Sequence, residues 1–184
     1  TNNHVIEEGK VFRVTLHDKR EFNAKLVGTD PSTDLALLKI NSAELPFLPF
    51  GNSDSLQTGE WVLAVGNPFN LESTVTAGIV SAKGRNISIL EDAYSIESFI
   101  QTDAAVNQDN SGGALLNNNG ELIGINTAII TRSGKYEGYS FAIPADLVKK
   151  VIRDIRDFGV VQRGILGVSI AAVTDNTAKK LNLK

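Results

Sequence analysis

The chain has 184 residues, enough to bury a hydrophobic core, and its 42% hydrophobic and 21% charged residues are typical of a globular protein and not of a disordered chain or a fibre. The formal net charge is −3 and the basic residues are scattered, so the positive surface that nucleic-acid-binding proteins need is absent. No apolar run reaches the roughly 18 residues that a membrane-spanning helix requires, which predicts no membrane span.

Two short runs of alternating apolar and polar residues lie in the first part of the chain, and a third, mostly apolar run follows them. Residues 11–16 and 22–27 flank a polar turn, and a third run covers residues 35–40. Alternation with this period is typical of half-buried β-strands. The stretch that follows is rich in Pro, Gly, Ser and Asn and indicates a surface connection. We therefore predict a first β-unit over residues 1–50.

A second group of strands is predicted over residues 51–143. Asn117 to Gly120 supplies the residues that a hairpin turn needs, because asparagine and glycine adopt positive φ at low cost. The 16 glycines, against only 5 prolines, also favour many tight turns between short strands. The six predicted strands are residues 61–65, 73–82, 96–101, 114–116, 122–130 and 139–143.

Within residues 144–160 the pattern changes from strand to helix. Apolar residues recur there at helical spacing with charged residues on the opposite face, and Gly159 is a typical helix stop. The tail, residues 161–184, indicates a short strand near residues 166–170 and a helical turn capped by Thr174, and it is too short to be a domain. The predicted class is all-β with one C-terminal helix.

Three short segments carry the residue types that acyl transfer by serine requires, namely an imidazole base, an orienting carboxylate and a hydroxyl nucleophile. They hold His4, Asp34 and Ser111, and the order His, Asp, Ser is that of chymotrypsin and not of subtilisins or α/β-hydrolases. Taken singly, each has a simpler interpretation: a surface histidine, a turn aspartate, and a tight turn at Ser-Gly-Gly. Their common order and flanking sequences favour the catalytic interpretation.

The flanking sequences resemble those of the HtrA/Deg family of bacterial envelope proteases. The resemblance covers nearly the whole chain and therefore rests on much more than one Asn-Ser-Gly-Gly match. Besides the three segments above, it includes WVLAVGNP at residues 61–68, TAGIV at 76–80, IQTDAA at 100–105 and GINTA at 124–128.

The resemblance implies a chymotrypsin/trypsin-like double β-barrel followed by a helix. The family has two strands and a regulatory loop before its histidine motif, whereas His4 is the fourth residue here, so we expect an incomplete first barrel. An exposed strand edge would remain there, and its fraying would leave His4 poorly positioned. The expected parts are a remnant of the first barrel (1–50), the second barrel (51–143), the helix (144–160), and a linker with the start of a PDZ domain (161–184).

The resemblance also implies roles for single residues. His4 corresponds to the general base, Asp34 to its orienting carboxylate and Ser111 to the nucleophile, with the N–H groups of Asp109 and Ser111 as oxyanion donors. The family normally has glycine where Asp109 stands. A carboxylate ~5 Å from the developing oxyanion, at an effective dielectric of ~20, costs about 3 kcal/mol, or roughly a hundredfold in rate. The sequence therefore predicts a weak or inactive protease.

Substrate preference is predicted from residues near the nucleophile. Trypsin-like enzymes that bind a basic P1 residue carry an aspartate six residues before the nucleophile, and this chain has Ala105 there. With Ile123, Ile125 and Ala128, this resembles a pocket for small or medium aliphatic P1 residues. The same apolar residues also fit a plain strand core, above all Ile123.

The resemblance further implies regulation, partners and location. Arg85 matches the arginine of the family's regulatory loop, although a solvated loop arginine is the simpler interpretation. Two histidines, no cysteine and no phosphate-binding loop predict neither metal nor cofactor. The implied substrates are unfolded or misfolded proteins of the periplasm or cell envelope, and the family forms homo-oligomers.

Two other functions remain open at this point. One is a non-catalytic, chaperone-like protein that binds unfolded polypeptides in the same cleft, and the other is a structural β-domain without a site. A fluorophosphonate probe separates them, because only an activated serine is labelled.

Overall fold

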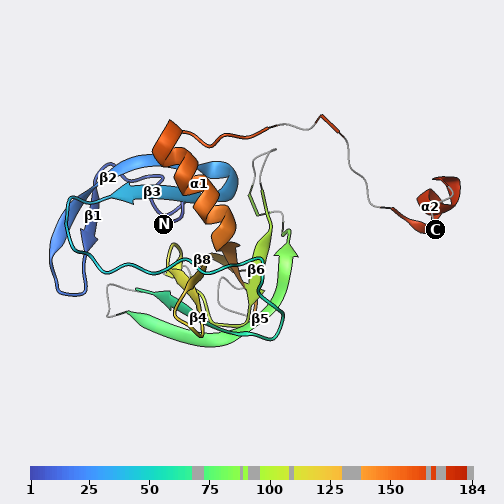
Figure 1. Cartoon of the computed structure of the whole chain (residues 1–184), viewed down its shortest axis with the longest axis horizontal. Helices are drawn as coiled ribbons and strands as arrows, with labels where there is room; N and C mark the ends of the chain where they lie inside the picture. Colours follow the sequence, from blue (N-terminus) through green and yellow to red (C-terminus); the bar gives the residue numbers. More distant parts are fainter. Residues whose placement is uncertain are drawn as a thin grey trace.

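The computed structural model describes residues 1–67, 73–87, 89–90, 96–107, 110–129, 138–164, 167–168 and 173–181. Two β-units and one long helix make up the body of the molecule, and a C-terminal segment extends away from it (Figure 1).

The N-terminal unit is an antiparallel sheet in the order β1-β2-β3, formed by Phe12–Thr15, Glu21–Asp30 and Leu35–Lys39. Half-buried and exposed residues alternate along β1, as the sequence pattern predicted. A single 3-10 turn, η1 (Pro31–Thr33), connects β2 to β3. Asn2 forms a β-bridge with Leu35 and so joins the N-terminal segment to β3.

The second unit is a closed barrel in the order β4-β5-β6-β9-β8-β7, in which all neighbouring strands are antiparallel. The predicted hairpin turn between β7 and β8 is confirmed, with Gly120 at φ 74. Inward-facing apolar side chains fill the barrel, among them Val62, Leu115 and Ile123, each fully buried. The strands are Trp61–Gly66, Thr74–Arg85, Phe99–Thr102, Ala114–Asn117, Leu122–Ile129 and Ser140–Pro144.

Helix α1 (Ala145–Phe158) packs against both β-units (Figure 1). It ends at Gly159, which has φ 77 and whose N–H donates to the Ile155 carbonyl, as expected for a glycine stop. Its apolar face joins a second core that contains residues from β3, β6 and β9, including Leu35, Phe99 and Phe141. This core fixes the N-terminal sheet relative to the barrel.

The fold class is therefore confirmed as all-β with a closed barrel, a second sheet and a C-terminal helix. Helix α2 (Asp175–Leu181) begins after Thr174, whose hydroxyl accepts the Thr177 N–H at 3.3 Å, and it lies apart from both β-units (Figure 1). The strand predicted near residues 166–170 falls mostly outside the described residues. Neither helix of the described part of the chain has the length and apolar composition needed to cross a membrane.

Candidate active site

Asp34 lies at the end of η1 in a conformation that few residues other than glycine adopt. Its φ of 57° and ψ of 39° are left-handed, a region that aspartate tolerates better than most residues. Its amide donates to the Pro31 carbonyl at 3.1 Å, and its own carbonyl accepts from the Asn3 amide and the Asn2 side chain, each at 3.0 Å. These bonds fix the backbone of a residue that is only 6% exposed.

His4 contacts the same carboxylate through both backbone and side chain. The His4 amide donates to Asp34 Oδ1 at 3.0 Å, and ring atom Nδ1 lies 2.7 Å from Oδ2. The hydrogen bond to Asp34 raises the pKa of His4, although partial burial works in the opposite direction. Because Nδ1 faces the carboxylate, Nε2 remains the ring nitrogen available for proton transfer.

Thr127, on β8 of the barrel, completes the surroundings of this carboxylate. Its hydroxyl donates to Asp34 Oδ2 at 2.7 Å, and its backbone carbonyl accepts from Ser111 Oγ at 3.2 Å. Burial raises the pKa of Asp34, but the hydrogen bonds from His4 and Thr127 outweigh it, so the pKa lies below its usual value. Thr127 therefore contacts both the Asp34 carboxylate, which follows the N-terminal sheet strand β2, and the Ser111 hydroxyl of the barrel unit.

Sequence reasoning assigned no role to Thr127. The available signal was its polarity within an apolar strand that was expected to be buried, because a hydroxyl there needs a hydrogen-bond partner.

Ser111 is half-buried in a tight turn that depends on the two following glycines. Gly112 has φ 82, and a Cβ atom there would lie 2.3 Å from the Thr1 hydroxyl oxygen. At Gly113 a Cβ atom would lie 2.1 Å from a carbonyl oxygen of β4, far inside contact distance. The approach of Thr1 to Gly112 brings the segment that carries His4 against the turn that carries Ser111. Three segments distant in sequence thus bring imidazole, carboxylate and hydroxyl to the junction of the two β-units.

Residues 1–125 match the family of trypsin-like peptidase domains. The chain belongs to this family. It is 53% identical over 178 residues to a "Probable periplasmic serine endoprotease DegP-like" of Chlamydia trachomatis serovar D, covering 97% of this chain and 35% of that protein. A protein of the same name from Marinomonas sp. is 52% identical over 183 residues, covering 100% of this chain and 38% of the relative.

Solved structures that are similar to this chain include HtrA-type proteases. The "HtrA-type protease AlgW with tripeptide" is 50% identical with a TM-score of 0.90, and the match covers 100% of this chain and 60% of that one. The same protease with a decapeptide is 51% identical with a TM-score of 0.87, covering 100% and 55%. The chain thus spans about a third of the length of these two curated relatives.

The residues predicted to form a substrate pocket occupy different environments. Ala105 is half-buried after β6, and its carbonyl accepts from the Thr76 hydroxyl at 2.7 Å. Ile125 is half-buried against the core beneath α1, whereas Ile123 is 0% exposed inside the barrel. Ile123 is therefore a core residue, and we leave it out of the proposed pocket. The Ala128 backbone pairs with β9, but its side chain is outside the described residues.

Functional roles were also predicted for Arg85 and Asp109. Arg85 is the exposed last residue of β5, and its Nε donates to the Gln101 side chain at 3.1 Å. Asp109, the expected oxyanion donor, lies outside the described residues. Its role therefore stays a prediction.

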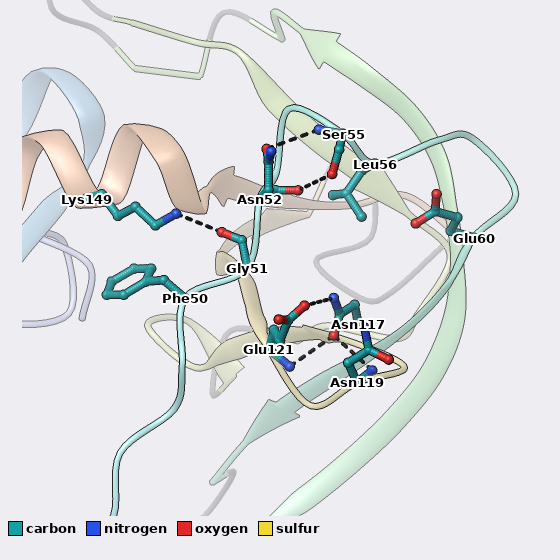
Figure 2. Close-up of a pocket in the computed structure, with 10 residues that line it drawn as sticks. All are labelled: Phe50, Gly51, Asn52, Ser55, Leu56, Glu60, Asn117, Asn119, Glu121 and Lys149. Atoms are coloured by element: carbon teal, nitrogen blue, oxygen red, sulfur yellow. Dashed lines mark hydrogen bonds between the residues drawn. The ribbon is translucent and has the colours of Figure 1, made fainter.

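A hollow of about 470 Å³ lies on another part of the molecule (Figure 2). Two of its charged groups already have partners: the Glu121 carboxylate accepts from Asn117 at 2.7 Å, and Lys149 donates to the Gly51 carbonyl at 2.8 Å. None of the three predicted catalytic residues lines it. The lining residues are Phe50, Gly51, Asn52, Ser55, Leu56, Glu60, Asn117, Asn119, Glu121 and Lys149.

No cluster of three or more His, Asp or Glu side chains suited to a metal ion occurs among the residues that the structure describes.

Proposed function

We propose that this chain is the proteolytic part of a DegP-like, HtrA-type serine endopeptidase. The observation that carries the proposal is the contact of His4 Nδ1 with Asp34 Oδ2 at 2.7 Å, joined to Ser111 through Thr127. This arrangement supports a base that is held in one orientation beside a potential nucleophile.

In the proposed reaction, the Ser111 hydroxyl turns from the Thr127 carbonyl toward His4. His4 Nε2 removes the hydroxyl proton while Oγ attacks the carbonyl carbon of the peptide bond. Asp34 stays ionised and stabilises the imidazolium that forms. The imidazolium then gives its proton to the leaving amine, and water, activated by the same base, hydrolyses the acyl-enzyme.

We propose the backbone N–H groups of Ser111 and Asp109 as the oxyanion donors. The Asp109 carboxylate opposes negative charge in this place, so turnover is expected to be weak. The variant Asp109→Gly should cleave casein or a peptide substrate about a hundredfold faster if the full repulsion acts on the transition state. Equal turnover of the two proteins would refute the inhibitory role of Asp109.

We propose unfolded or misfolded proteins of the periplasm as the substrates, since the curated relatives carry the words periplasmic serine endoprotease in their names. Ala105, Ile125 and Ala128 are proposed to favour small or medium aliphatic P1 residues, because none of them is charged. Profiling the cleavage sites in an unfolded protein tests this preference. Cuts mainly after Lys or Arg would contradict it.

A fluorophosphonate probe tests the enzyme assignment directly. The probe should label the protein at Ser111, while Ser111→Ala and His4→Ala should remain unlabelled. Asp109 favours one alternative function, a non-catalytic binder of unfolded chains. That alternative predicts binding of a denatured protein without labelling, and this result would overturn the enzyme assignment.

The tail and the loops contribute two further proposals. Residues 161–184 are proposed to be a linker and the start of a PDZ domain; the described tail exposes Val168, Val173 and Leu181 by 58%, 63% and 63%, as expected for part of a larger core. A longer polypeptide that includes the complete domain should bury these side chains, as hydrogen exchange of the tail would reveal.

Arg85 is proposed to regulate the catalytic loop. In this role its side chain would leave the hydrogen bond with Gln101.

A further inference from the structure

An ion pair between a buried carboxylate and a partly exposed guanidinium, which the proposed reaction does not use, lies at the start of the turn that carries Asp34. Asp30 is the last residue of β2, and its side chain is 6% exposed. Arg163 donates to both of its carboxylate oxygens, with Nη1 to Oδ1 at 2.8 Å and Nη2 to Oδ2 at 2.5 Å. Two parallel bonds from a planar guanidinium fix the orientation of a carboxylate as well as its position.

The same carboxylate holds the turn itself. The Thr33 hydroxyl donates to Asp30 Oδ2, so the residue immediately before Asp34 is tied to the Asp30–Arg163 pair. Asp34 follows with a left-handed backbone, a conformation that persists where the surrounding structure holds it. Loss of the Asp30 charge would therefore remove the carboxylate that both the turn and the partly exposed Arg163 guanidinium contact.

Arg163 is in turn held by helix α1. Asp154 Oδ2 accepts the amide of Gln162 at 2.9 Å, and Lys150 donates to the Gln162 carbonyl at 3.0 Å while it also pairs with Asp154. The residue before Arg163 is thus fastened to the helix by both of its backbone groups. The guanidinium therefore reaches Asp30 from a segment that is hydrogen-bonded to α1.

We propose that Asp30 and Arg163 are positioning residues that hold the Pro31–Thr33 turn so that the Asp34 carboxylate meets His4. Neither residue touches the reacting atoms. The inference deepens the proposed function and rests on it, since it assigns the orientation of the Asp34 carboxylate to a contact made by the segment that follows α1.

The experiment combines kinetics with a readout that does not need activity. In Asp30→Asn, kcat for a peptide substrate should fall about 10- to 100-fold with little change in KM, because a displacement of about 1 Å can cost this much. An NMR titration of the His4 imidazole should show a lower pKa than in the parent protein, because its hydrogen bond to Asp34 is weakened. His17, the only other histidine, supplies an internal reference signal.

One variant with a smaller change and two control variants accompany Asp30→Asn. Arg163→Lys retains the charge but not the two parallel bonds, so its kcat and His4 pKa should lie between those of the parent and Asp30→Asn. Glu21→Gln breaks the exposed pair with Arg13 on the same sheet and should change neither quantity. Val62→Ala, in the barrel core, controls for general destabilisation.

An unchanged His4 pKa in folded Asp30→Asn and Arg163→Lys would overturn the proposal, whatever happens to kcat. If the parent protein proves not to be a peptidase, the His4 titration still decides whether Asp30 positions the Asp34 carboxylate.

Discussion

The Asp34 carboxylate accepts three hydrogen bonds, two from His4 and one from Thr127. A buried carboxylate without partners would take up a proton, because burial disfavours the charged form. Here the donors keep the pKa of Asp34 below its usual value, so the carboxylate is ionised when His4 becomes positively charged. The N-terminal unit supplies the Asp34 carboxylate and the barrel supplies one of its donors, so this hydrogen-bond network depends on the contact between the two units.

Removal of the Thr127 hydroxyl should weaken this site. Thr127→Val keeps the shape of the side chain but deletes a hydrogen bond to a charged group, which costs about 1.5–3 kcal/mol and corresponds to roughly 10- to 100-fold in kcat/KM. Thr127→Ser retains the hydroxyl and should keep most of the activity. Steady-state kinetics on a peptide substrate measure both variants. Parent-like kcat/KM in Thr127→Val would mean that the bond does not support catalysis.

The pH dependence should follow His4. The base must be neutral to accept the Ser111 proton, and its pKa is raised above the ordinary 6.5, so kcat/KM should rise with pH through a midpoint above 6.5. Asp34→Asn removes the hydrogen-bonded charge and should move this midpoint downward while it lowers the rate. A pH–rate profile measures both effects. A midpoint at or below 6.5 in the parent protein would contradict this assignment of the base.

The pKa shifts of His4 and Asp34 also make the stability of the fold depend on pH. The raised pKa of His4 means that its contribution is fully present below pH 6.5 and is lost as the pH rises through the folded-state value. The lowered pKa of Asp34 means that its contribution is present above pH 3.8 and is lost as the pH falls through the folded-state value. The pair should therefore stabilise the fold most between pH 3.8 and 6.5.

Among the elements, α1 begins with a cap from a distant segment. Pro144 at its N-cap position provides no side-chain hydrogen bond, but the Ser53 hydroxyl accepts the Asp146 N–H at 3.0 Å. In return, the amide and hydroxyl of Ser53 each donate to Asp146 Oδ2 at 2.8 Å. This reciprocal pair fastens the connection between the β-units to the start of the helix.

Asp146→Ala should lower the free energy of unfolding by about 1 kcal/mol, since the side chain is partly exposed and its bonds are worth correspondingly less. Burial raises the pKa of Asp146, but the bonds from Ser53 and Lys149 outweigh it and lower the pKa to about 2. Its contribution is therefore present above pH 3.8 and is lost as the pH falls toward 2. Urea unfolding at pH 7 and pH 2 measures this. An equal deficit at both pH values would contradict the ionic origin of the effect.

The strands and α1 could be predicted because apolar periodicity is a local property of the sequence. The sequence flanking His4, Asp34 and Ser111 predicted catalytic roles for them, and these roles stay predictions. Thr127 and the Asp30–Arg163 pair were not predicted, because their roles arise from contacts between residues 93 and 133 positions apart. Ile123 was compatible with both a pocket and a core, since a strand pattern alone does not show which face of a closed barrel is the interior.

In the molecule as a whole, the relative placement of sheet and barrel sets how the Asp34 carboxylate meets Thr127 of β8 and, through it, Ser111. Helix α1 packs on both units, and it comes close to β2 at Gly28, where an added Cβ atom would lie 2.7 Å from Ile155 Cγ2. Glycine there lets the helix pack directly on the sheet. The core around Ile155 combines this helix with residues of β3, β6 and β9.

Ile155→Ala should therefore affect both stability and catalysis. The side chain is 1% exposed, and its truncation should lower the free energy of unfolding by about 2–5 kcal/mol. Phe158→Ala is the matched control on the same helix, because Phe158 is 64% exposed and should cost little. Urea unfolding followed by tryptophan fluorescence at Trp61, which lies on the barrel, and by far-UV circular dichroism should give coincident transitions if sheet and barrel unfold together. If the two probes give separate transitions in Ile155→Ala, and kcat falls before the barrel unfolds, then the helix holds the N-terminal sheet and the barrel in the relative position that activity needs. An unchanged kcat and an unchanged free energy of unfolding would refute this role of α1.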